Sequence, residues 1–476
     1  MGRRASGDLF LIPFNMKKSI LTILVFLLSC KLSTAFAQVE LGGAIEKAPA
    51  PTPTIVRDYT DEQRDETDPI ILNRLEEWKD LKFGFMVHWG IYAQWATVES
   101  WSICSEPWIT SRGVGYEEYK RKYQELNTTF NPKGFSPSKW ARAAASAGMK
   151  YFVFTTKHHD GFCLYDTYET TYSTTNSSCP FFKNKYSDIT RALTDAFREQ
   201  GMWIGYYFSK PDWHCPDYWA PEWATPDRNV NYSIADNQAR WKKYCDFTFN
   251  QIRELTHNYG DLDILWLDGG WIRPEWSVND ESRPWLGCSG QIQDINMPRI
   301  ARMARDNNPD LLIVDRSVGG KYENYRTPEK QIPDEPLPYP WETCMTMGDS
   351  WSYVNNDNYK STNQLIHMLC DIVAKGGNLL LNVGPNANGE IPEPCLLRME
   401  EIGEWLKANG EAIYGTRPLK PYAKNNVRYT QSKDGMHRYI IYLLDEGVNP
   451  PSRIEVDGLV YRIKKKTKHA VIAEMF

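Results

Sequence analysis

The sequence lacks the motifs by which several large classes of protein are recognised. It has 10 cysteines, but none of them forms a CxxC pair or another spacing typical of a zinc site. No GxGxxG or Walker motif follows any apolar run, so a nucleotide-binding sheet is not indicated. The net charge of −5 over 476 residues gives no reason to expect a nucleic acid as partner. We therefore predict a protein with neither a zinc site nor a nucleic-acid partner.

The N-terminal residues have the composition of a targeting segment. Residues 16–37, MKKSILTILVFLLSCKLSTAFA, combine a basic start, an apolar stretch and a small-residue pattern that ends at Ala37. The apolar stretch is too short for a convincing membrane span. We predict a signal peptide over 1–37, with translation starting at Met16 and cleavage after Ala37, and hence a secreted or periplasmic protein. Lipid anchoring through Cys30 is an alternative. The nine other cysteines are an odd number, and we expect most of them to be small buried hydrophobes rather than a disulfide framework.

Residues 38–57 contain the proline-rich run KAPAPTPT, which predicts a linker to a folded region that begins at residue 58. From there on, apolar runs of strand length alternate with amphipathic segments of helical spacing. The runs predicted to be strands are 83–90, 151–161, 203–210, 263–270, 311–317, 340–346 and 378–385. The helices predicted between and after them are 136–150, 189–201, 237–260, 296–309 and 361–377, with a last helix within 391–416.

This alternation predicts an α/β fold with a parallel sheet, which is either a closed (β/α) barrel or an open doubly wound sheet. Nearly every predicted strand carries His, Asp, Arg, Glu or Asn at its carboxyl end. Barrel enzymes collect catalytic groups from several strand ends on one face, whereas an open sheet concentrates them at one switch point beside a glycine-rich loop. We therefore predict a TIM-like (β/α) barrel over residues 58–416.

The remaining residues, 417–476, have a strand-like pattern with a turn signal at Asp457-Gly458. They predict a small C-terminal β domain. A two-sheet sandwich needs roughly 100 residues, so this domain is a short or truncated β-sandwich.

The run TTKHHDGF places His158 and His159 at the end of the second predicted strand, and His88 ends the first strand in the same way. If strand conformation continues, the two adjacent histidines point to opposite faces and cannot both bind one metal. Imidazoles that donate and accept hydrogen bonds suit a ligand rich in hydroxyl groups. The 18 tryptophans and 27 tyrosines either form a large aromatic core or supply flat apolar faces for sugar rings.

Carboxylates at strand ends are candidates for acid–base or nucleophilic chemistry. Asp268 in WLDGG follows an apolar strand, and Arg316 at the next strand end could keep it ionised. A second carboxylate could be Glu323, Glu329 or Glu342. Glu329 lies in a long Pro-rich connection that could fold over the barrel mouth, where burial would raise its pKa. Two carboxylates, aromatic platforms and several hydroxyl-binding groups together indicate glycoside hydrolysis.

Five blocks of the sequence resemble glycoside hydrolase family 29, the α-L-fucosidases. They are FGFMVHWGIY, KYFVFTTKHHDGFCLYDT, ILWLDGGW, PWETCMTMGDSWSY and GGNLLLNVGPNANGEIP, and they occur in the expected order within residues 58–416. The resemblance implies an imperfect (β/α) barrel followed by a β-sandwich, and retaining hydrolysis without a cofactor or metal. It also implies that a fucosylated oligosaccharide or glycoconjugate is the substrate.

The resemblance assigns a role to each matching residue. Asp268 corresponds to the nucleophile, and Glu329 in TPE resembles the acid/base of one subgroup of the family, with Glu323 and Glu342 as alternatives. The residues that match sugar-binding positions are His88, His158, His159, Tyr207, Trp266, Arg316 and Trp351, of which Trp351 faces the C5 methyl group of fucose.

Two features depart from the family pattern. The connection 273–293 after the nucleophile is longer than expected and could narrow the leaving-group side, and the C-terminal region is short. Two alternative functions stay open. One is a barrel glycosidase that acts on a related sugar such as L-galactose, and the other is a secreted sugar-binding protein without catalysis.

Overall fold

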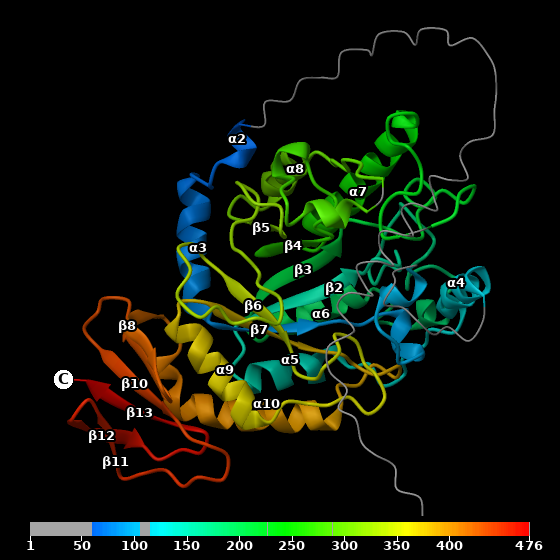
Figure 1. Ribbon diagram of the computed structural model, residues 1–476. Coiled ribbons are helices and arrows are strands. Elements are labelled where there is room, and N and C mark those ends of the chain that lie inside the picture. Colours follow the sequence, from blue (N-terminus) through cyan, green and yellow to red (C-terminus); the bar gives the residue numbers. More distant parts are fainter. Residues whose placement is uncertain (1–59, 105–114, 226, 288, 476) are drawn as a thin grey trace, which may run out of the picture. The chain divides into compact units, whose positions relative to one another are not determined.

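The computed structural model describes residues 60–104, 115–225, 227–287 and 289–475 (Figure 1). The predicted signal peptide, with Met16, Cys30 and Ala37, and the linker 38–57 lie outside these residues. None of the helices in the described part of the chain is both long enough and apolar enough to span a membrane.

A parallel sheet of seven strands forms the larger part of the fold (Figure 1). Each strand falls within one of the seven predicted runs, so the prediction of a TIM-like (β/α) fold is confirmed. The strands are β1 (Phe83–Val87), β2 (Tyr151–Lys157), β3 (Trp203–Ser209), β4 (Ile264–Asp268), β5 (Leu312–Asp315), β6 (Glu342–Thr346) and β7 (Asn378–Val383). Their order in the sheet is β5-β4-β3-β2-β1-β7-β6. Nearly all of their residues are buried, as expected for a parallel sheet that is covered on both faces.

The two edge strands of this sheet, β5 and β6, do not pair with each other. An extended segment, residues 322–330, lies between them and bridges to both. The amide of Asn324 donates to the carbonyl of Ile313 in β5 (2.9 Å), and the amide of Lys330 donates to the carbonyl of Cys344 in β6 (2.9 Å). The half-barrel of seven strands is therefore completed by a segment without regular strand structure. Most of the loop that we predicted to fold over the mouth, YENYRTPEKQIP, therefore lies in the barrel wall.

Each predicted helix is present, as α5 to α10, and three helices that we did not predict, α2 to α4, precede them in the chain. The helices are α2 (Thr60–Gln63), α3 (Pro69–Leu81), α4 (Tyr116–Gln124), α5 (Pro137–Ser146), α6 (Ile189–Arg198), α7 (Gln238–Asn258), α8 (Met297–Asn307), α9 (Thr362–Ala374) and α10 (Glu393–Asn409). Local sequence explains where several of them begin. At α9, the Ser361 hydroxyl accepts from the Gln364 amide while the Gln364 side chain accepts from the Ser361 amide, which satisfies two amides of the first turn.

The C-terminal strands form one antiparallel sheet of six strands, with the order β11-β12-β13-β10-β9-β8. The strands are β8 (Thr416–Lys424), β9 (Val427–Ser432), β10 (Arg438–Leu443), β11 (Arg453–Val456), β12 (Leu459–Lys465) and β13 (Ala470–Met475). The predicted turn at Asp457-Gly458 joins β11 to β12, and both residues have positive φ (53° and 77°), as a two-residue hairpin turn requires.

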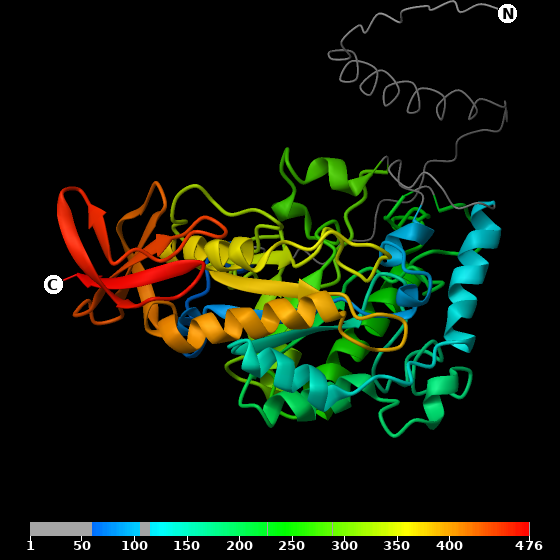
Figure 2. The same ribbon diagram turned by 90° about the horizontal axis from the view of Figure 1, so that it is seen from below.

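One face of this sheet packs against helices of the barrel rather than against a second sheet (Figure 2). The Trp405 indole of α10 donates to the carbonyl of Ala470 (2.9 Å), and Arg428 of β9 pairs with Asp371 of α9. Ile441 and Ile472 join the large hydrophobic core of the barrel, whereas the other face has its own small cluster. The helices thus cover the face that a second sheet covers in a sandwich, which explains how so short a β region buries its apolar side chains.

Candidate active site

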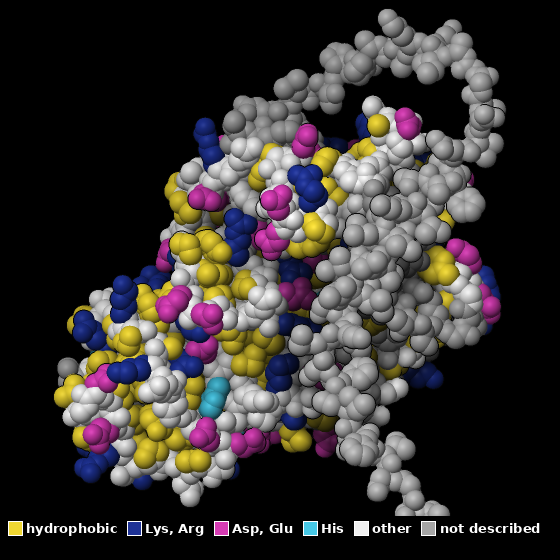
Figure 3. Space-filling model, in the orientation of Figure 1, with side chains coloured by type: hydrophobic (Ala, Val, Ile, Leu, Met, Phe, Trp, Pro, Cys, Tyr) yellow, Lys and Arg dark blue, Asp and Glu magenta, His cyan; other side chains and the backbone are white. Residues whose placement is uncertain are grey.

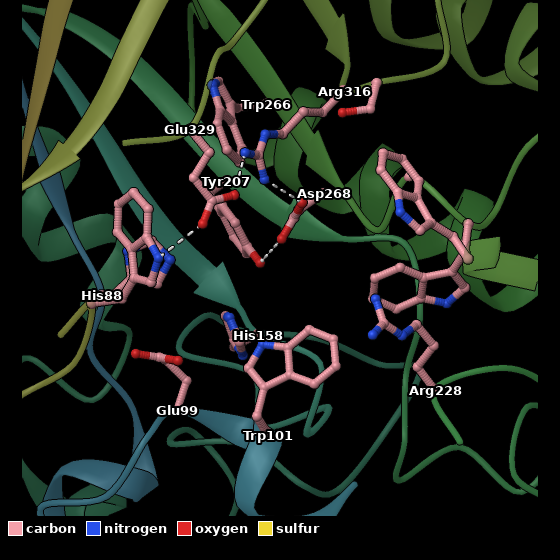
Figure 4. A pocket seen from close by; sticks show the side chains of 15 residues that line it. His88, Glu99, Trp101, His158, Tyr207, Arg228, Trp266, Asp268, Arg316 and Glu329 are labelled. Carbon is pink, nitrogen blue, oxygen red and sulfur yellow. Dashed lines mark hydrogen bonds and ion pairs between the residues drawn. The ribbon is translucent and has the colours of Figure 1, made fainter. Parts of the chain in front are cut away.

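The carboxyl ends of five parallel strands surround one pocket of about 220 Å³. The face seen in Figure 3 is hollowed near its centre, where acidic and basic side chains lie together, and Figure 4 shows the pocket itself. Its lining comprises His88, Glu99, Trp101, His158, Tyr207, Arg228, Trp266, Asp268, Gly270, Trp271, Trp285, Arg316, Ser317, Glu329 and Trp351. Of the nine predicted site residues, all except His159 are in this lining. The pocket is smaller than the roughly 300–1,000 Å³ of sites for drug-sized ligands, which suits a single sugar ring.

Asp268, the last residue of β4, is held by two hydrogen-bond donors and has a histidine close by. Its carboxylate accepts from Arg316 Nη1 (3.0 Å) and from the Tyr207 hydroxyl (2.7 Å), and His159 Nε2 lies 3.7 Å away. Burial by itself raises the pKa of Asp268, but the positive charge of Arg316 and the neighbouring His159 outweigh it. The pKa of this carboxyl is therefore well below its usual value, and Asp268 is an anion at neutral pH.

Glu329 lies on the other side of the same guanidinium (Figure 4). Its carboxylate accepts from Arg316 Nη2 (2.5 Å) and from the Trp351 indole (3.2 Å), and its side chain is 44% exposed. Burial raises the pKa of Glu329, but the charge and the hydrogen bond of Arg316 lower it by more. The sequence-based expectation of a raised pKa is thus wrong, because it did not include a cation that bridges both carboxylates.

The two adjacent histidines do not point to opposite faces, contrary to the prediction. Strand β2 ends at Lys157, so the alternation of a strand no longer applies, and the two rings lie with their centroids 4.3 Å apart. His158 lines the pocket and stacks on Tyr207 (5.6 Å, 8°), and its Nδ1 is 2.5 Å from the Ser100 hydroxyl. His159 lies behind the lining against Asp268, as described above, and its buried Nδ1 contacts no hydrogen-bond partner in the described residues.

The third histidine, His88, follows β1, and its Nδ1 is 2.8 Å from the Asn382 side-chain oxygen. Burial lowers the pKa of His88 to about 4 and that of His159 to about 3, and it lowers the pKa of His158 as well. All three imidazoles are therefore neutral at pH 7 and can each donate and accept one hydrogen bond. Within the described residues, no group of three or more His, Cys, Asp or Glu side chains has the geometry to hold a metal ion.

Of the three candidate glutamates, Glu329 alone is in the lining of this pocket. Glu342 is fully buried inside the barrel, where it accepts from the Tyr151 hydroxyl (2.6 Å) and the Trp266 indole (3.3 Å), and burial raises its pKa to about 7. Glu323 accepts from the backbone amides of two residues in the turn after β5 (2.8 Å each) and pairs with Arg326. Both groups are tied into the structure around the site.

Sequence reasoning missed several residues of the lining, among them Glu99 and Trp101. They lie in the connection after β1, where no strand or helix period marks them. Glu99 is buried (3% exposed) and accepts from the Ser352 amide (2.8 Å), and burial raises its pKa. Arg228, Trp271 and Trp285 also come from connections. The abundance of tryptophan was a signal for this, but it does not indicate which of the 18 residues line the pocket.

A second buried ion pair supports the strand ends from behind. Lys210, directly after β3, contacts Asp315 at the end of β5 (2.5 Å) and donates to the carbonyl of Ile272 (2.8 Å). Both side chains are almost completely buried (0% and 3% exposed). The ends of β3, β4 and β5, which carry Asp268 and Arg316, are thus fixed relative to one another.

A TIM-like barrel with a bridged carboxylate pair, neutral imidazoles and tryptophans at its strand ends has the construction of a glycoside hydrolase. Residues 56–411 match the family model described as alpha-L-fucosidase. The chain therefore belongs to the α-L-fucosidase family, glycoside hydrolase family 29.

Individual relatives agree with this assignment. The chain is 28% identical over 391 residues to the alpha-L-fucosidase of Dictyostelium discoideum, covering 78% of each protein. It is 32% identical to alpha-L-fucosidase isoenzyme 1 from Paenibacillus thiaminolyticus, with a TM-score of 0.66 over 85% of this chain and 99% of the other. It is 25% identical to the Thermotoga maritima alpha-fucosidase in complex with fucose, with a TM-score of 0.58 over 84% of this chain and 92% of the other.

Proposed function

We propose that this enzyme is a retaining exo-α-L-fucosidase that removes terminal α-L-fucosyl residues from glycans through a covalent fucosyl-enzyme. The proposal depends above all on the position of Asp268, an anion at a strand end that faces a pocket for one sugar ring. Glu329 is bridged to it by a single guanidinium, which favours the short carboxylate separation, about 5–5.5 Å, of retaining enzymes. The Thermotoga maritima relative binds fucose and, in another structure, a mechanism-based inhibitor.

In the first step, an oxygen of Asp268 attacks the anomeric carbon while Glu329 gives its proton to the glycosidic oxygen, which leaves as an alcohol. In the second step, Glu329 takes a proton from water, the resulting hydroxide attacks the anomeric carbon, and Asp268 leaves as a carboxylate. Two inversions give net retention. A sugar that fills the pocket excludes water from Glu329, so the burial that raises its pKa increases and favours the protonated acid.

The charge of Asp268 also raises the pKa of Glu329. When Asp268 becomes an ester, this contribution disappears and the pKa of Glu329 falls. The same carboxyl is thus a better acid donor before the first step and a better base after it.

The other lining residues suit recognition of a 6-deoxy sugar. Neutral His88 and His158 and buried Glu99 offer donors and acceptors for ring hydroxyls. The Trp351 ring, 4.9 Å from the ring of His88, offers an apolar face for the C5 methyl group. A hydroxyl at that place, as in L-galactose, would have to be buried against the indole at a cost.

Replacing Asp268 by alanine tests the nucleophile. We expect no turnover, and we expect azide or formate to restore activity with an inverted product, because a small anion can enter the space of the carboxylate. Full activity of Asp268→Ala would exclude the mechanism.

Replacing Glu329 by glutamine tests the acid/base. We expect a large loss on unactivated glycosides and a small loss of the first step on aryl fucosides, whose leaving groups need little protonation. The control is Glu335→Gln, which changes an exposed glutamate of the same connection. Equal losses of Glu329→Gln on both substrates would assign the acid to another residue.

Residues 16–37 support the further proposal that the enzyme acts outside the cytoplasm after cleavage of a signal peptide. Sequencing the N-terminus of the enzyme from its native host tests this, since a mature chain that begins at Gln38 is expected.

A further inference from the structure

A second hollow, of about 460 Å³, adjoins the active-site pocket. We call it the side groove. Trp285 and Ser317 belong to the lining of both the pocket and the side groove, so the two spaces lie side by side. The side groove is lined by Arg273, Asn279, Glu281, Ser282, Trp285, Ser317, Val318, Gly319, Glu323, Arg326, Thr327, Pro328, Leu337 and Tyr339.

The side groove lies on the side of the acid/base. Thr327 and Pro328 line it, and the next residue, Glu329, lines the active-site pocket. Thr327 is itself fixed, because its hydroxyl accepts from Arg316 Nε (3.0 Å). A general acid stands beside the oxygen of the leaving group, so the side groove adjoins the pocket on the side where Glu329 places the leaving group.

Two connections form the walls of the side groove, and hydrogen bonds to the backbone hold them in place. The first wall comes from residues 273–285, which belong to the connection that is longer than expected for the family. Buried Arg273 fixes it by donating to the carbonyls of Ser277 (2.9 Å) and Ser317 (2.5 Å). The second wall, residues 326–339, begins in the segment that completes the barrel. The side groove is therefore formed before a ligand binds, which lowers the entropy cost of binding.

The chemistry of the side groove suits an uncharged ligand with an apolar face. Its ionisable side chains other than tyrosine are two arginines and two glutamates, so the lining has no excess of either charge. Arg273 donates to three backbone carbonyls. Arg326 pairs with Glu323, and its guanidinium lies 5.6 Å from the centre of the Tyr339 ring. Tyr339 is 44% exposed, and such exposed aromatic faces are available for stacking.

We propose that the side groove binds the neutral saccharide that leaves with the glycosidic oxygen, with Trp285 and Tyr339 as its aromatic contacts. This inference builds on the fucosidase function proposed above and adds to it the class of leaving group. The volume of the side groove lies in the range of about 300–1,000 Å³ for ligand pockets, which is enough for one or two sugar rings. Binding energy from this remote part of the substrate then lowers the barrier at the anomeric carbon.

The test measures kcat/KM of each variant on two substrates and compares the two values. α-L-Fucosyl fluoride has a single atom as leaving group and cannot use the side groove, whereas a neutral fucosylated trisaccharide can. For Trp285→Ala and Tyr339→Ala, we expect the ratio of kcat/KM for the trisaccharide to kcat/KM for the fluoride to fall by about tenfold or more. This ratio does not depend on how much of a preparation is folded. Trp223→Ala and Tyr168→Ala, which remove exposed aromatics that line neither space, should leave the ratio unchanged.

A second measurement follows transfer of the fucosyl group from the enzyme to an acceptor sugar, which is the reverse of the step that releases the leaving group. With the fluoride as donor, lactose or N-acetyllactosamine in the side groove should compete with water for the fucosyl-enzyme and give a trisaccharide. The ratio of transfer to hydrolysis should fall in Tyr339→Ala.

The outcomes separate the two proposals. Failure of the native enzyme to hydrolyse the fluoride would overturn the fucosidase proposal and this one with it. Fluoride hydrolysis together with unchanged ratios in both Trp285→Ala and Tyr339→Ala would overturn the side groove alone. A sialylated substrate preferred over its neutral counterpart would likewise contradict a neutral leaving group.

Discussion

Replacing Arg316 by glutamine should move the whole pH profile of kcat/KM to higher pH. Asp268 must be deprotonated to attack and Glu329 must be protonated to donate, and Arg316 lowers the pKa of both groups. Two unit charges 3.0 Å apart attract each other by roughly 5 kcal/mol at an effective dielectric constant of about 20. The pKa values of carboxylates beside an arginine are lowered by about 1–3 units in practice. We therefore expect both limbs of the profile to rise by about 1–3 units.

The measurement is kcat/KM from about pH 3 to pH 9 on an unactivated fucoside, whose leaving group needs the proton of Glu329, since this quantity reports the pKa values of the free enzyme. The sign follows from the two roles: a higher pKa of Asp268 removes activity on the acid side, and a higher pKa of Glu329 extends activity on the alkaline side. Arg316→Lys keeps the charge and loses the planar fork, so its limbs should stay close to those of the native enzyme although its rate is lower. A slower Arg316→Gln enzyme with both limbs in their original places would refute this account of the charges.

Three further predictions concern stability and selectivity. Burial raises the pKa of Glu342 to about 7, so between the usual carboxyl pKa and pH 7 this carboxyl is protonated in the folded state and ionised in the unfolded state. The free energy of unfolding should therefore fall by about 3 kcal/mol as the pH rises through this range. Glu342→Gln should remove this loss, so the difference in melting temperature between this variant and the native enzyme should increase in favour of the variant from about pH 5 to pH 8. The control Glu404→Gln, which changes an exposed glutamate, should show no such increase. Asp315→Asn leaves Lys210 buried without its counter-charge and should lower the free energy of unfolding by about 3–5 kcal/mol in urea; a loss below about 1 kcal/mol would mean that the pair is dispensable. Trp351→Ala should lower the ratio of kcat/KM for an aryl L-fucoside to that for the L-galactoside by roughly tenfold, and an unchanged ratio would show that another surface selects the methyl group.

The comparison of sequence and structure differs between regular and irregular segments. Each parallel strand was predictable because a strand buried on both faces must be a short run of apolar residues, as in β4, whose ILWLD also places Asp268 at its end. The histidines after β2 were predictable as polar groups at a strand end, but their directions were not. Those directions depend on where β2 stops, and hydrogen bonds to neighbouring strands decide this.

Other parts of the site left no periodic signal at all. The segment 322–330 completes the barrel through isolated bridges to β5 and β6, and no alternation of apolar residues marks it. Glu99 reaches the pocket from a connection, where its neighbours in the sequence do not predict its surroundings. The pKa of Glu329 was predicted in the wrong direction, since a pKa depends on charges that lie close in space and Arg316 is 13 residues away in the chain.

The order of apolar runs, the polar residues that end them and the blocks shared with a known family were enough to determine the fold class and the kind of chemistry. These are local properties, because hydrophobic spacing and a carboxylate at a strand end can be read within about ten residues. Only the tertiary structure decided that Arg316 joins both carboxylates, that the barrel is closed by an irregular segment and that a preformed groove adjoins Glu329. Distances between groups far apart in the chain set electrostatic coupling and the shape of a cavity, and these distances exist only once the chain has folded.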